Sequence, residues 1–242
     1  MKFIPPYMFM FIPCSSLNKE KEMVQHRHLF AVIGGLLSCQ VNADIELAFL
    51  PLSEWEKKRF EGETEYQLVQ NIHFNAPVLY GRSEASASGL IREMEIDLTE
   101  TPWISWYWKV SESPTVTNEI FKAQDDFAWR IGVTVTPGLT MMSSETIIYV
   151  WSANKTHNSF WGNPFSPRSF KMLAANGGVE KGEWQYVSRN VREDFQRLYG
   201  ENYRTLSAVS IMSDSDNSKS RSAAYMSTIR FSSSPIPPFN FP

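Results

Sequence analysis

A carboxylate and a guanidinium, those of Asp126 and Arg130, stand four residues apart in a segment whose polar and apolar residues alternate. On an extended strand over 126–135 this spacing puts both side chains on one face, with their Cα atoms about 13 Å apart. At that distance they cannot pair directly, so we expect the partner of Arg130 to come from another strand or loop. The candidates are the acidic residues Asp125, Asp214 and Asp216. A guanidinium in a pocket pairs with carboxylates through parallel hydrogen bonds, whereas on an open sheet face it is a solvated charge.

A second alternating segment carries aromatic residues on both faces. Trp106 and Trp108 share one face, and Tyr107 and Lys109 share the other. If this strand adjoins the strand that carries Arg130, we expect aromatic rings, Lys109 and Arg130 to line one cleft together with a carboxylate. Such a face can bind a glycan, because sugar rings stack on aromatic rings while charged groups hydrogen-bond the hydroxyls. An ordinary solvated face of an antiparallel sheet is the alternative.

Two further tryptophans are candidate ligand contacts. Trp151 ends the apolar run 145–151, and Trp161 lies in an aromatic loop that also contains glycine, asparagine and proline. Trp151 is either a core residue or a platform for a ligand. The loop around Trp161 is either a binding element on a rigid scaffold or a lid packed on the edge of a sheet.

Clustered oxygen donors occur at Asp214, Asp216 and Asn217, an arrangement that resembles the start of a calcium loop. The segment is not an EF-hand, because no glycine stands at its sixth position and Tyr225 stands where a bidentate glutamate belongs. Asp126 and its neighbour Asp125 add carboxylates if the fold brings them near. A structural calcium ion is therefore the one cofactor that the sequence indicates, and a polar turn held by side-chain hydrogen bonds is the alternative.

Several kinds of chemistry are excluded by what the chain lacks. After residue 43 there is no cysteine, and the two histidines, His73 and His157, lack ligand spacing. The chain has no GxSxG, no HExxH and no glycine-rich phosphate loop, so serine, zinc and nucleotide chemistry are not expected. A hydrolase with paired carboxylates remains open. The net charge of −3 excludes a general nucleic-acid binder, because no basic excess exists to neutralise phosphates.

The first 43 residues have the pattern of an export signal. A basic segment after Met23 precedes an apolar run over 29–37, and small residues before Asp44 predict cleavage there. The run is about half the ~20 residues that a membrane span needs, so the mature chain is expected to be periplasmic or secreted. The physiological start is predicted at Met23. A lipoprotein anchored at Cys39 is the alternative.

Period-two alternation dominates the rest of the chain and predicts an all-β fold. Strands are expected at 103–110 and 126–135 and in five similar runs, 145–151, 169–175, 184–190, 206–212 and 223–231. Helices are expected only at 53–60 and 191–199, the second ending at Gly200. This pattern predicts one two-layer antiparallel β-sandwich over 44–234, jelly-roll-like, with a proline-rich tail over 235–242. Trp106, Trp108, Phe127, Trp129, Ile131 and Val133 are expected inside it.

Seven motifs occur in a fixed order, at 60–66 (FEGETEY), 86–90 (SASGL), 106–109 (WYWK), 125–131 (DDFAWRI), 149–152 (YVWS), 191–195 (VREDF) and 211–217 (IMSDSDN). Over about residues 47–232 the chain thereby resembles an uncharacterised family of exported proteins of Gram-negative bacteria, known as a domain of unknown function. The resemblance implies an exported β-sandwich and no activity, substrate or cofactor. The motif positions it carries over are Lys109, Asp125, Asp126, Arg130, Trp151, Asp194, Asp214, Asp216 and Asn217. Thr228 departs from the family pattern, where a carboxylate is expected, and this weakens a metal or catalytic role for that strand.

Three functions follow from these residues. The first is a binding module for a glycan or a cell-envelope polymer, with Tyr107, Lys109, Asp126, Arg130, Trp151 and Trp161 as ligand contacts. The second is a polysaccharide hydrolase or lyase that uses Asp126 with Arg130 or Lys109. The third is a structural or assembly protein of the cell envelope.

Overall fold

The computed structural model describes residues 44–177 and 181–239. The predicted signal peptide lies outside the described residues. Within the described part of the chain, no helix is long and apolar enough to cross a membrane.

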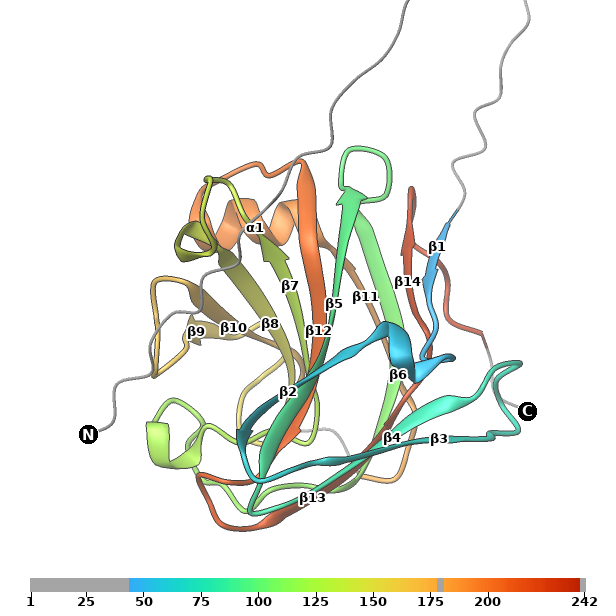
Figure 1. Cartoon of the computed structure of the whole chain (residues 1–242), viewed down its shortest axis with the longest axis vertical. Coiled ribbons are helices and arrows are strands. Elements are labelled where there is room, and N and C mark those ends of the chain that lie inside the picture. Colours follow the sequence, from blue (N-terminus) through green and yellow to red (C-terminus); the bar gives the residue numbers. More distant parts are fainter. Residues whose placement is uncertain (1–43, 178–180, 240–242) are drawn as a thin grey trace, which may run out of the picture. The chain divides into compact units, whose positions relative to one another are not determined.

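Fourteen strands, one α-helix and three 3₁₀ turns make up the described chain (Figure 1). The strands are β1 (Ile45–Leu47), β2 (Glu56–Glu61), β3 (Glu65–Val69), β4 (Val78–Glu84), β5 (Ala87–Asp97), β6 (Trp103–Glu112), β7 (Arg130–Val135), β8 (Glu145–Ser152), β9 (Phe160–Gly162), β10 (Phe170–Gly177), β11 (Gln185–Asn190), β12 (Thr205–Asp214), β13 (Arg221–Met226) and β14 (Ile229–Ser232). The helix α1 spans Val191–Tyr199, and the 3₁₀ turns span Leu52–Glu54, Lys122–Gln124 and Met141–Ser143.

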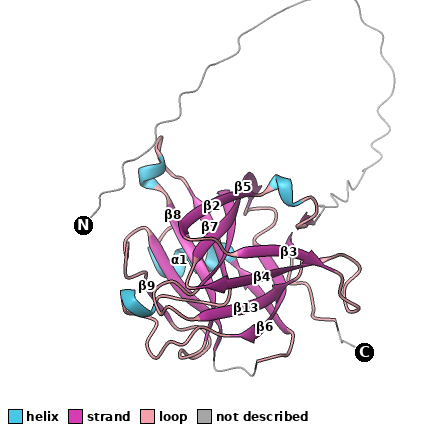
Figure 2. Cartoon of the chain, turned by 60° about the horizontal axis from the view of Figure 1, so that its bottom comes forward, coloured by secondary structure: helices cyan, strands magenta, loops and turns pink. Residues whose placement is uncertain are grey.

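The strands form two seven-stranded sheets, which confirms the predicted β-sandwich. Sheet A has the order β1-β14-β6-β13-β4-β3, with β11 paired to the other side of β6. Sheet B has the order β2-β5-β12-β7-β8-β10-β9. Among the described strand pairs all are antiparallel except β8 with β10. Figure 2 shows β3, β4, β13 and β6 of sheet A side by side, and their outward face becomes important below.

The core lies between the sheets and contains the aromatic residues that alternation predicted. Trp106 on β6 packs against Tyr149 on β8, with ring centroids 5.6 Å apart, and Trp108 donates a hydrogen bond to Asn176 on β10. Trp129 also reaches across the core, to β4, where a Cβ on Gly81 would lie 2.7 Å from the indole. A glycine at position 81 therefore makes room for this ring.

One predicted helix is correct and the other is wrong. The helix α1 begins after Asn190, whose side chain accepts from the backbone N–H of Glu193, and ends at Gly200 with φ of 80°. The segment 53–60 instead holds part of a 3₁₀ turn and then β2. The Ser53–Glu56 capping pattern does not start a helix here, because β2 pairs with β5. Interstrand hydrogen bonds to β5 satisfy the backbone groups of β2 that a helix would otherwise pair.

Candidate functional site

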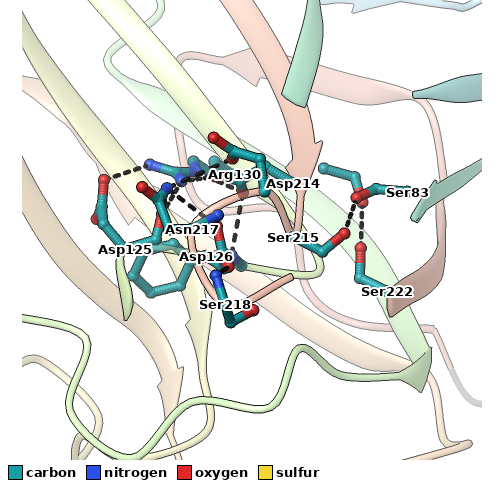
Figure 3. A network of polar contacts seen from close by, with 12 residues as sticks. Ser83, Asp125, Asp126, Arg130, Asp214, Ser215, Asn217, Ser218 and Ser222 are labelled. Atoms are coloured by element: carbon teal, nitrogen blue, oxygen red, sulfur yellow. Dashed lines mark hydrogen bonds and ion pairs between the residues drawn. The ribbon is translucent and has the colours of Figure 1, made fainter. Parts of the chain in front are cut away.

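Arg130 is the first residue of β7 and lies on the outward side of sheet B, with only 7% of its surface exposed. Its Nε donates to Asp214 Oδ1 at 2.9 Å, and a second nitrogen bonds the other oxygen of the same carboxylate. The remaining nitrogen donates to Asp125 Oδ2 at 3.2 Å. The guanidinium also lies 4.8 Å from the ring centroid of Phe127. Of the three candidate partners of Arg130, Asp125 and Asp214 hold it, as predicted, whereas Asp216 forms no ion pair with it in the described structure (Figure 3).

In this network, residues of the motif at 125–131 form hydrogen bonds with residues in and next to the motif at 211–217 (Figure 3). The Phe127 N–H donates to Asp214 Oδ1 at 3.0 Å, and the Asp214 N–H donates to the Phe127 carbonyl at 3.1 Å. Asp126 accepts from the backbone N–H groups of Asn217 at 3.1 Å and of Ser218 at 2.6 Å. These bonds tie residues 125–129 to the loop after β12. The prediction of one strand over 126–135 is therefore wrong at its start, and Asp126 and Arg130 do not share a strand.

Next to this network, hydrogen bonds between serine side chains connect the two sheets. Ser215, the residue after Asp214, hydrogen-bonds Ser83 on β4 of sheet A, and Ser213 bonds Ser222 at 2.8 Å (Figure 3). We call the set Asp125, Asp126, Arg130, Asp214, Asn217 and Ser218 the arginine network. It connects β7, β12 and two loops.

Burial raises the pKa of two carboxyls in the arginine network, Asp214 and Asp125, and of the neighbouring Asp216. The pKa of Asp214 rises to about 7, against the opposing effect of the Arg130 guanidinium. Burial likewise raises the pKa of Asp125 and of Asp216, and in Asp216 the charge of Asp126 adds to it. Arg130 remains protonated, because the two carboxylates that face it raise its pKa above the ordinary value. One cation thus stabilises several carboxylates in a region with little solvent.

A metal ion has a candidate set of ligands here. One oxygen from each of Asp126, Asp214 and Asp216 lies within 4.8 Å of the others. Both oxygens of Asp214 and of Asp126 already accept hydrogen bonds, so an ion would have to share them. Asn217, the third predicted ligand, turns its amide nitrogen toward Asp126 at 3.1 Å. The calcium site stays a prediction.

Lys109 does not join Arg130 in one cleft, and that expectation is wrong. Lys109 is on β6 of sheet A, whereas Arg130 is on β7 of sheet B, and these strands are not neighbours. Because Trp108 and Val110 face the core, Lys109 points outward from sheet A. Its Nζ lies 4.7 Å from the ring centroid of Tyr225 and 5.4 Å from that of Trp184.

An aromatic row crosses the outer face of sheet A at this point. Lys109 is opposite Tyr225 on β13, Tyr225 is opposite Tyr80 on β4, and Tyr80 is opposite Gln67 on β3. The rings of Tyr80 and Tyr225 have centroids 4.9 Å apart. We call Lys109, Tyr225, Tyr80, Gln67 and the adjoining Trp184 the aromatic row. A row of charged residues borders it, since Glu65 is opposite Arg82, and Ala223 on β13 is opposite both Arg82 and Glu112.

Three other predicted ligand contacts, Trp151, Tyr107 and Trp161, belong neither to the arginine network nor to the aromatic row. Trp151 is 4% exposed and belongs to the core between the sheets. Tyr107 is 6% exposed, and its ring packs against Phe74 and Phe239, with its hydroxyl accepting from the Phe239 N–H at 2.8 Å. Trp161 is half-buried on β9 and packs on Phe127, 6.4 Å away between centroids. Trp151 and Tyr107 therefore have little surface left for a ligand, contrary to their predicted role.

Sequence reasoning missed Tyr80, Tyr225 and Trp184. Tyr225 lies inside a run that was recognised as a strand, but alternation shows only that it shares a face with Ala223. Its position beside Lys109 depends on the pairing of β13 with β6, across more than a hundred residues of chain. No local signal reports that pairing.

Comparisons with solved structures found β-sandwich proteins at low similarity. The family 30 carbohydrate-binding module of a cellulosomal cellulase from Clostridium thermocellum aligns with a TM-score of 0.42 and 11% identity, covering 74% of this chain and 91% of the module. A cleaved adhesin domain of Lys-gingipain from Porphyromonas gingivalis aligns with 0.36 and 11%, covering 79% and 99%. The xyloglucanase domain of a type three effector from Sinorhizobium fredii aligns with 0.35 and 9%, covering 79% and 99%. At these TM-scores the likenesses carry no functional meaning for this chain.

The family comparison is more direct. A search of curated proteins found no match. Residues 53–230, which include the arginine network and the aromatic row, match the family described as "Protein of unknown function (DUF3047)". The chain therefore belongs to the DUF3047 family.

Proposed function

We propose that this protein is a glycan-binding module that holds sugar rings against the outer face of sheet A. The observation that carries the proposal is the aromatic row, which places Lys109, Tyr225, Tyr80 and Gln67 on four adjacent strands. With strands ~4.8 Å apart, the row extends about 14 Å, a length suited to a short oligosaccharide. Because a signal peptide is predicted over 1–43, the proposal includes that the module acts outside the cytoplasm.

The chemistry of the row suits a pyranose. The C–H groups on one side of a sugar ring are weakly positive and meet the electron-rich face of a tyrosine or tryptophan. Gln67, Glu65 and Arg82 are exposed at the border of the row and offer donors and acceptors to hydroxyl groups. Apolar and aromatic side chains with a small number of polar groups around them are the usual composition of a ligand site.

An enzyme that uses Asp126 with Arg130 receives no support from their surroundings. Asp126 is 1% exposed, and both of its oxygens accept backbone hydrogen bonds. Arg130 is occupied by two carboxylates. A group that is to act as a general acid or base needs access to the substrate.

The proposal is tested by titrating the protein with peptidoglycan and polysaccharide fragments while tryptophan fluorescence is recorded. We expect at least one fragment to bind, and Tyr225→Ala and Tyr80→Ala to weaken that binding at least tenfold. The matched control is Phe60→Ala, which removes an aromatic ring that is 69% exposed on β2 of sheet B. If the folded protein responds to no fragment, or if the control weakens binding equally, the glycan proposal is wrong. Capture of a defined envelope protein without glycan binding would instead favour the assembly role.

A further inference from the structure

Lys109 differs from the other cations on the strands of sheet A. Those strands carry five lysine and arginine residues, and four of them pair with a carboxylate. The pairs are Arg82 with Glu84 at 3.7 Å, Arg189 with Asp194 at 2.5 Å, Arg221 with Glu84 at 2.7 Å and Arg230 with Glu46 at 3.0 Å. Within the described residues, Lys109 has no carboxylate oxygen within 4.0 Å.

The Lys109 ammonium group is also held in place. It lies over the ring of Tyr225 at 4.7 Å and over that of Trp184 at 5.4 Å, and the side chain is half-buried. Two rings on one side exclude part of its water, and cation–π attraction restricts where it can go. A partly desolvated cation with no carboxylate in direct contact gains more from a ligand anion than a fully hydrated lysine does.

We infer, on the basis of the proposed function, that the glycan is acidic and that Lys109 binds the carboxylate of a uronic acid in it. The ring of that sugar stacks on Tyr225, and its carboxylate meets the ammonium at the end of the aromatic row. The surroundings favour one isolated charge over a densely charged polymer. Glu65 and Glu112 offset Arg82 and Lys109 around the row, so these positions offer no cluster of cations of the kind that a heavily sulfated chain requires.

The experiment compares sugars that differ only in this charge. Neutral oligosaccharides that carry a single galacturonate, glucuronate or mannuronate residue are titrated by calorimetry, each beside its methyl ester, against the wild-type protein, Lys109→Met and Lys109→Arg. We expect the wild-type protein to bind one of the acids at least tenfold more tightly than its ester. Lys109→Met should bind that acid only as tightly as the ester, whereas Lys109→Arg should keep part of the preference. Added salt should reduce the preference, because it screens the charge pair.

Two controls separate the possible outcomes. Arg230→Met removes a paired cation from β14 of the same sheet and should leave the preference unchanged. Circular dichroism verifies that each variant is folded. If acid and ester bind the wild-type protein equally, the inference about the carboxylate is wrong while the glycan proposal stands. Preference for sulfated dextran over every uronate would also overturn it. If no sugar binds, the glycan proposal itself fails and the inference fails with it.

Discussion

Arg130 and Lys109 each lie against an aromatic ring, at 4.8 Å from Phe127 and at 4.7 Å from Tyr225. Their other neighbours differ. Arg130 is 7% exposed and bonds two carboxylates, whereas Lys109 is half-buried and pairs with no described carboxylate. The motif positions around Arg130 form the more crowded polar cluster. Apart from Asp125 Oδ1, which is buried without a hydrogen-bond partner, the carboxylate oxygens of the arginine network already accept hydrogen bonds from within the chain.

The comparison shows that a dense group of polar residues is a poor indicator of a ligand site by itself. In the arginine network the protein supplies both charges, so the network contributes to the fold and to the position of the loops. On the aromatic row the protein supplies rings and one cation, and the matching groups must come from outside. A binding surface is therefore better recognised by what its side chains still lack.

The largest effect is expected from Arg130→Met. Because it leaves Asp214 and Asp125 buried without their cation, we expect the free energy of unfolding to fall by about 3–5 kcal/mol. Lys109→Met is the matched control, and the loss of cation–π contacts from this half-buried side chain should cost at most about 2 kcal/mol. Urea unfolding followed by fluorescence measures both. Equal stability of Arg130→Met and the wild-type protein would remove the contrast and reopen the arginine network as a ligand site.

A smaller effect is expected from pH. Because burial raises the pKa of Asp214 to about 7, the folded state binds more protons than the unfolded state between about pH 4 and 7. The free energy of unfolding should therefore decrease as the pH rises through this range, by up to about 1.4 kcal/mol per pH unit for one proton. Asp214→Asn should remove this contribution. Urea unfolding of both proteins between pH 4.5 and 7.5 measures it.

Asp97→Asn is the control for the pH experiment. Hydrogen bonds from Thr99 lower the pKa of Asp97, which is exposed, so its contribution is present above the unfolded pKa and lost in more acidic solution. It should leave the slope between pH 4.5 and 7.5 unchanged. A slope that is the same in wild-type protein and Asp214→Asn would contradict the raised pKa.

The smallest effect is expected from calcium. Arg130 already neutralises Asp214, and backbone N–H groups occupy Asp126, so millimolar calcium should raise the Tm by less than about 2 °C. Differential scanning calorimetry with and without a chelator measures it. A much larger rise that Asp216→Asn abolishes would show that the acidic residues bind an ion, and would make the arginine network a ligand site after all.

Sequence alone predicted the sandwich, because alternation is a strong local pattern. It also named two correct carboxylate partners of Arg130, Asp125 and Asp214, from the clustering of aspartates, although the second lies far away in the chain. Alternation identified the faces of β6 and β7, and the candidate partners of Arg130 came from two aspartate clusters, at 125–126 and 214–216. Alternation does not show which strands are neighbours. It therefore predicts Lys109 beside Arg130, whereas the neighbour of Lys109 in the structure is Tyr225. The segment now known as β2 failed for a related reason, since its capping pattern is local while its pairing with β5 is not.

The C-terminal segment has a practical consequence for anyone who tags this protein. Phe239 packs on Phe74 at 5.5 Å between centroids, and Phe74 packs on Trp184 at 4.8 Å. An affinity tag fused after Pro242 would be separated from Phe239 by only three residues, so we expect it to compete with ligands for the nearby rings. The loop between β7 and β8, where Leu139 is fully exposed, belongs to sheet B and offers a better insertion point. A protein immobilised through that loop would keep its aromatic row open to solution.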